Sequence, residues 1–71
     1  MSKIKVGQVW KNDYERIVIT HKHKALNVFC YIDNKGVTVY EDDACFIRRN
    51  YTLLAEYPTW QEAINSEEFR K

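Results

Sequence analysis

Three runs of β-branched and aromatic residues follow one another between residues 16 and 40, and they constrain the fold more than any other feature. The runs are R-I-V-I-T (residues 16–20), N-V-F-C-Y-I (27–32) and V-T-V-Y (37–40). Such residues favour strands. The intervening D-N-K-G at 33–36 is a strong turn signal, because Gly36 suits a left-handed backbone position. The segment therefore predicts a three-stranded antiparallel meander.

Alternation of apolar residues predicts the register of this meander. Pairing Thr20 with Asn27 places Ile19 opposite Val28, and the 33–36 turn pairs Ile32 with Val37. The residues then expected to face the core are Ile17, Ile19, Val28, Cys30 and Ile32. The same register gives two outward rows, Arg16–Tyr31–Thr38 and Val18–Phe29–Tyr40.

Strands are also expected on both sides of the meander. The first, from Ile4 to Val9, is interrupted by Gly7, and the last covers residues 51–56. Between them, Asp42 and Asp43 predict a short helical turn that points Phe46 into the core. Thr59 and Glu62 have capping-box spacing, which predicts a helix over about 59–66.

The fold class predicted from these elements is mainly β, with five strands within residues 3–56 and a short C-terminal α-helix. Seventy-one residues make a single domain. Closure into a small barrel would protect the strand edges that such a short domain cannot leave bare. The pattern alone leaves SH3-like and OB-like closure open.

Three segments carry a resemblance to a known family. They are G-Q-V-W-K-N (7–12), E-R-I-V-I-T (15–20) and V-T-V-Y-E-D-D-A-C-F-I-R-R-N-Y-T-L-L (37–54). The chain resembles, over essentially its whole length, the YorP family of small proteins encoded by SPβ-type prophages. The resemblance implies an SH3-like barrel over residues 1–71 and a phage origin. It transfers no catalytic or ligand-binding residue.

Composition narrows the classes of function. The net charge of +1 gives no overall field for nucleic acid or membrane, yet residues 1–24 hold six Lys/Arg against two acidic residues. The longest apolar run, residues 28–32, is far too short to cross a membrane. The N-terminus lacks the apolar region of a signal peptide, so a cytoplasmic location with reduced cysteines is expected.

Catalytic and metal-binding roles are not expected. The stretch T-H-K-H-K-A-L (20–26) holds His21 and His23, but the register makes it a hairpin loop without further ligands. Cys30 is expected to point inward, and two glycines cannot make a phosphate-binding loop. The sequence predicts no enzyme activity, no cofactor and no metal.

Two kinds of binding remain open. Single-stranded nucleic acid would use aromatic residues of the outward rows for stacking and neighbouring cations for phosphates. The candidates are Arg16, Lys22, Lys24, Phe29, Tyr31 and Tyr40. The competing interpretation is that the helix carrying Trp60 and Ile64 packs on the face formed by Val18, Phe29 and Tyr40 and covers it.

Protein binding would use an aromatic-lined groove between loops, as SH3-like barrels often do. The candidates are Trp10, Tyr14, Tyr51, Arg48 and Arg49. Protein binding ranks above nucleic-acid binding, because a net charge of +1 predicts weak phosphate affinity. The expected partner is a host or phage protein, bound by a monomer that does not associate with membranes.

Overall fold

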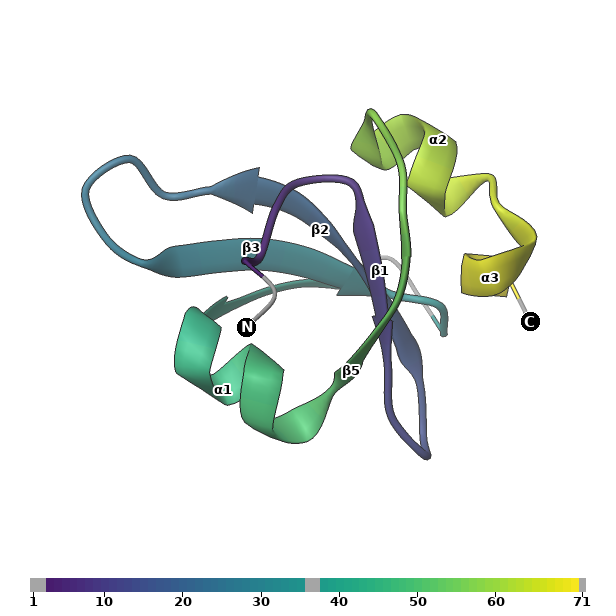
Figure 1. The fold of residues 1–71 in the computed structure, drawn as a ribbon, viewed down its shortest axis with the longest axis horizontal. Helices are drawn as coiled ribbons and strands as arrows, with labels where there is room; N and C mark the ends of the chain where they lie inside the picture. Colours follow the sequence, from purple (N-terminus) through teal and green to yellow (C-terminus); the bar gives the residue numbers. More distant parts are fainter. Residues whose placement is uncertain (1–2, 36–37, 71) are drawn as a thin grey trace.

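A computed structural model describes residues 3–35 and 38–70. Within them the chain forms five strands and three short helices (Figure 1). The elements are β1 (Gln8–Lys11), β2 (Arg16–Lys22), β3 (Val28–Asp33), β4 (Val39–Asp43), α1 (Ala44–Asn50), β5 (Thr52–Glu56), α2 (Trp60–Ile64) and α3 (Glu67–Arg70). The mainly β class, the meander and the strand after α1 agree with the sequence prediction.

The strands form one antiparallel sheet in the order β4-β3-β2-β1-β5. β4 and β5 lie at its two edges, and among the described residues no pairing joins these edges. The sheet is therefore open, and a closed barrel is not confirmed. α1 lies at one side of the sheet, and α2 and α3 lie together at the other (Figure 1).

The register of the β2–β3 hairpin differs from the prediction. Ile19 pairs with Tyr31 instead of Val28, and the register shifts between Ile19 and His21, which leaves Thr20 as a bulge. The ladder also runs further, to the pair Lys22–Phe29. An odd shift exchanges the faces of a strand, so Phe29 and Tyr31 point to the face that holds Ile19. The outward rows predicted for the meander are not formed.

The β3–β4 register is also shifted. Ile32 pairs with Val39, whereas the predicted partner, Val37, lies outside the described residues. Cys30 pairs with Glu41 and is half-buried, and its thiol donates to Glu41 Oε2 at 3.7 Å. The prediction that Cys30 lies in the core is therefore wrong.

The first core lies on the face of the sheet covered by α1. Its buried residues are Ile4, Trp10, Ile17, Ile19, Phe29, Tyr31, Ala44, Ile47 and Tyr51. Asp43 caps α1, because its Oδ1 accepts from the Phe46 N–H at 2.8 Å. Ala44 and Ile47 are the buried residues of α1, whereas Phe46 is 42% exposed. The prediction that Phe46 points into the core is therefore wrong.

The second core lies on the opposite face, under α2 and α3. Its buried residues are Val9, Val18, Ala63 and Phe69, and Trp60 and Ile64 pack against them. The predicted cap is present, since Thr59 Oγ1 accepts from the Glu62 N–H at 3.2 Å. The C-terminal helices thus cover Val18, but Phe29 is buried in the first core, on the other face.

The segment before β1 is held across the sheet by backbone contacts of Gly7. Its N–H donates to the Ile19 carbonyl at 2.9 Å, and its carbonyl accepts from the Tyr57 N–H at 3.1 Å. The φ of Gly7 is +95°, a value that L side chains rarely adopt. These contacts fix the direction in which residues 3–6 leave the sheet, and those residues form one wall of the site below.

Candidate functional site

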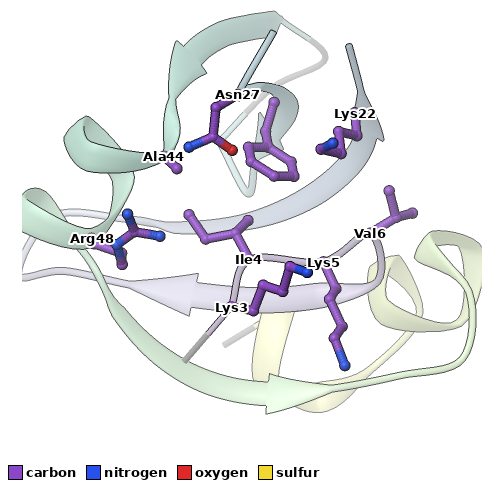
Figure 2. A pocket seen from close by; sticks show the side chains of 9 residues that line it. Lys3, Ile4, Lys5, Val6, Lys22, Asn27, Ala44 and Arg48 are labelled. Carbon is purple, nitrogen blue, oxygen red and sulfur yellow. The ribbon is translucent and has the colours of Figure 1, made fainter. Parts of the chain in front are cut away.

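Four residues with cationic side chains line one hollow of about 420 Å³. We call it the basic pocket, and Figure 2 shows it from close by. It is lined by Lys3, Ile4, Lys5, Val6, Lys22, Asn27, Phe29, Ala44 and Arg48.

Three separate parts of the chain supply the cations of the basic pocket. Lys3 and Lys5 alternate with Ile4 and Val6 in the N-terminal segment. Lys22 is the last residue of β2 and Arg48 lies in the last turn of α1. Figure 2 shows Lys22 and Arg48 on different sides of Ile4, while Lys5 extends away from the centre.

The floor of the basic pocket is apolar and firmly packed. Ile4, Phe29 and Ala44 belong to the first core. The Ala44 N–H donates to the Asn27 carbonyl at 3.0 Å, which ties the start of α1 to the β2–β3 hairpin. The start of α1, which carries Arg48, is therefore joined to the hairpin that carries Lys22.

Buried Gln8 holds the N-terminal wall. Its Oε1 accepts from the Lys5 N–H at 2.9 Å and from Trp10 Nε1 at 3.0 Å. Its Nε2 donates to the Lys3 carbonyl at 3.0 Å and to Glu56 Oε1 at 2.7 Å. A buried amide with all these partners fixes the backbone that carries Lys3 and Lys5.

The charged residues that line the basic pocket are all positive, and none of the lining residues is acidic. Cations gathered around a concave surface repel one another and attract an anion. The basic pocket is thus suited to binding an anionic group. Because the pocket is open to solvent, salt would screen its charges and weaken that binding.

The residues predicted to bind nucleic acid do not lie on one surface, because the strand register differs from the predicted one. Lys22 and Phe29 meet in the basic pocket, but Phe29 is only 3% exposed. Tyr31 is buried and stacks on Tyr40 with ring centroids 5.5 Å apart. The remaining two lie elsewhere: Lys24 is exposed in the hairpin loop, and Arg16 donates to the Glu68 carbonyl on α3.

The protein-binding candidates do not form a groove. Trp10 and Tyr51 are buried, with 4% and 9% exposed, whereas Tyr14 is 80% exposed at the tip of the β1–β2 hairpin. Arg48 lines the basic pocket, but its neighbour Arg49 does not. Lys22 and Phe29 from the nucleic-acid set and Arg48 from the protein-binding set therefore line the same pocket.

Burial and nearby carboxylates shape the titration of several side chains. Burial raises the pKa of Tyr31, and the hydrogen bond from its hydroxyl to Asp42 Oδ2, at 2.6 Å, adds to this effect. Tyr51 behaves alike: burial and its hydrogen bond to Glu15 raise its pKa. Burial and Glu41 raise the pKa of the Cys30 thiol, which keeps it protonated at neutral pH.

The histidine-rich stretch lies in the β2–β3 hairpin, as expected, but Lys22 belongs to β2 and pairs with Phe29 instead of lying in the loop. His21 pairs with Cys30 and its ring lies 6.0 Å from that of Trp60. His23 Nδ1 accepts from the Ala25 N–H in the loop. In the part of the chain that the structure describes, no group of three or more His, Cys, Asp or Glu side chains could hold a metal ion.

Sequence reasoning missed Lys3 and Lys5 as site residues. The excess of positive charge in residues 1–24 was the available signal, since three of the four pocket cations come from that part of the chain. What the sequence did not reveal was that Gly7 and Gln8 bring this segment beside α1.

Comparison of the chain with models of known protein families, with curated proteins and with solved structures finds no match. Among the described residues, no helix has the length and apolar character needed to span a bilayer.

Proposed function

We propose that this chain is a non-catalytic protein-interaction module, and that its partner places an acidic segment in the basic pocket. The observation that carries the proposal is that four basic residues and no acidic residue line a hollow with an apolar floor. Carboxylates on a partner would relieve the repulsion among these cations.

The placement of the charges supports a local rather than a global attraction. The net charge of the chain is only +1, and acidic residues dominate α2, α3 and the β4 edge. A partner is thus drawn to one end of the molecule.

We also propose an SH3-like arrangement for the open sheet and a cytoplasmic location. The resemblance to the YorP family makes a host or phage protein the expected partner.

Single-stranded nucleic acid is the second candidate, because Lys22 and Arg48 could also contact phosphates. The burial of Phe29 and Tyr31 weakens this alternative, since base stacking needs an exposed ring face. Tyr40 is partly exposed, but it does not line the basic pocket.

Two pairs of neighbouring residues provide a matched test. Lys22 and Arg48 line the basic pocket, whereas Lys24, on the same hairpin, and Arg49, on the same helix, do not. The double variant K22A/R48A and the control K24A/R49A have the same net charge, so any difference between them reports position. Binding of a fluorescently labelled Glu-rich peptide is measured by anisotropy at low salt.

We expect K22A/R48A to weaken binding by about five- to thirty-fold, since each exposed ion pair contributes up to about 1 kcal/mol and pocket geometry favours the upper range. The control should bind nearly as tightly as the wild type. Equal losses in the two variants would mean that the pocket is not the site, and binding of an oligonucleotide in preference to the peptide would favour the second candidate.

A further inference from the structure

We infer that the segment bound in the basic pocket has an apolar residue flanked by acidic residues on both sides. This inference rests on the proposed function and adds the order of residues in the ligand. Three features of the pocket carry it, namely its size, the distribution of its cations and the exposure of its apolar lining.

The basic pocket is larger than a lone inorganic anion. Its volume is about 420 Å³, and a water molecule occupies about 30 Å³ in the liquid. The hollow is thus much larger than the space of a single water molecule. A ligand that fills it has an uncharged part in addition to its charged groups. A short peptide segment has both.

The cations are distributed around the apolar centre instead of lying together at one end. Arg48 and Lys22 lie on different sides of Ile4, and Lys3 accompanies the N-terminal segment (Figure 2). A ligand with all its charge at one end would pair with one side and leave the other unneutralised. Anionic groups on both sides of an uncharged centre match the arrangement.

We expect the uncharged centre of the ligand to be apolar and compact. The pocket floor is made of Ile4, Phe29 and Ala44, which are packed in the first core. Val6 keeps 38% of its surface exposed at the wall and offers the open apolar contact. An aliphatic side chain such as leucine can cover Val6, whereas a nucleobase finds no exposed ring face on which to stack.

The test compares two peptides of identical composition. In the first, leucine lies between two pairs of glutamates; in the second, leucine is moved to one end and the glutamates are contiguous. Both have blocked termini, so their charges are equal. We expect the first peptide to bind the wild-type protein at least about fivefold tighter, because the second can neutralise only one side of the pocket while its leucine contacts Val6.

Single substitutions test whether Val6 and Arg48 cause the preference for the first peptide. V6A should weaken binding of the first peptide and reduce the difference between the two, whereas V39A, at an exposed position on β4, should leave the difference unchanged. R48A should bring the first peptide close to the second, and R49A should not.

The outcomes separate the inference from the proposed function. Equal affinity for the two peptides, with both weakened in K22A/R48A, would overturn the inference and leave the proposed function standing. Absence of binding by either peptide would overturn both. An oligonucleotide that displaces the first peptide and binds more tightly would replace the peptide with nucleic acid as the ligand.

Discussion

Trp10 and Gln8 are joined in the interior, where the indole Nε1 of Trp10 donates a hydrogen bond to Gln8 Oε1 at 3.0 Å. Trp10 therefore faces the core instead of a partner. The same amide oxygen accepts from the Lys5 N–H, so this contact links the first core to the wall of the basic pocket. Gln8 thus has both a structural and a positioning role.

Replacing Gln8 by leucine tests that role. The variant leaves the buried Trp10 N–H without its acceptor, which costs about 1–3 kcal/mol, and releases the Lys3 carbonyl. We expect urea unfolding to report a loss of about 2 kcal/mol. Q61L, at an exposed position on α2, serves as the control and should change stability by less than about 0.5 kcal/mol. A similarly small change in Q8L would contradict the account.

Gly7 is expected to tolerate no side chain. A Cβ atom at this position would lie 2.3 Å from the Tyr57 carbonyl oxygen, and the φ of +95° is unfavourable for alanine. We expect G7A to cost at least about 2 kcal/mol, which lowers the melting temperature of a domain of this size by about 8–16 °C. Calorimetry of G7A beside K24A measures this, and equal melting temperatures would show that the backbone contact is dispensable.

The positions of most elements could be predicted from the sequence because their signals are local. The β-branched runs gave β2 and β3, and Thr59 with Glu62 gave the start of α2. Asp43 was also identified correctly as the start of a helical turn. Each of these features depends on a few neighbouring residues.

The strand faces could not be predicted, because the sheet is covered on both sides. Alternation of apolar and polar residues reports the faces of a strand only where one face of the sheet is buried and the other is solvated. Here Val18 packs in the second core, while Ile17 and Ile19 pack in the first, so alternation gave no reliable register. The bulge at Thr20 adds a shift that no local residue pattern indicated.

The candidate site could be predicted only in part. Lys22 and Arg48 were identified as candidates for different ligands, and their meeting in one pocket depends on the contact between Ala44 and Asn27 that brings α1 to the β2–β3 hairpin. The N-terminal segment reaches the pocket through long-range contacts of Gly7 with Ile19 and Tyr57. Such contacts leave no periodic trace in a single sequence.

Two phenylalanines test the assignment of the cores. Phe69 is buried in the second core, whereas Phe46, expected inside from the sequence, is 42% exposed. We expect F69L to cost about 1–2 kcal/mol and F46L less than about 0.5 kcal/mol in urea unfolding. The opposite ranking would mean that α1, and not α3, contributes the buried ring.

Alkaline pH should destabilise the fold through its buried tyrosines. Burial and Asp42 raise the pKa of Tyr31 above that of an unfolded tyrosine, which is about 10. The folded state therefore holds the phenolic proton more tightly. The resulting stability is complete below about pH 10 and is lost as the pH rises above it.

The free energy of unfolding, measured by urea titration on both sides of about pH 10, should therefore fall with pH in the wild type. It should fall less steeply in Y31F. Y14F, which changes an exposed ring, should keep the wild-type slope. An identical slope in Y31F would exclude Tyr31 as a source of the alkaline sensitivity.

The most direct test of the central claim is to map peptide binding residue by residue on the intact chain by NMR. On titration with the leucine-centred acidic peptide, we predict amide shift changes at residues 3–6, Lys22, Asn27 and Arg48, with α2 and α3 unaffected. The changes should diminish as salt is added. Shift changes gathered on α2 and α3, or around Tyr14, would contradict the claim that the basic pocket is the binding site.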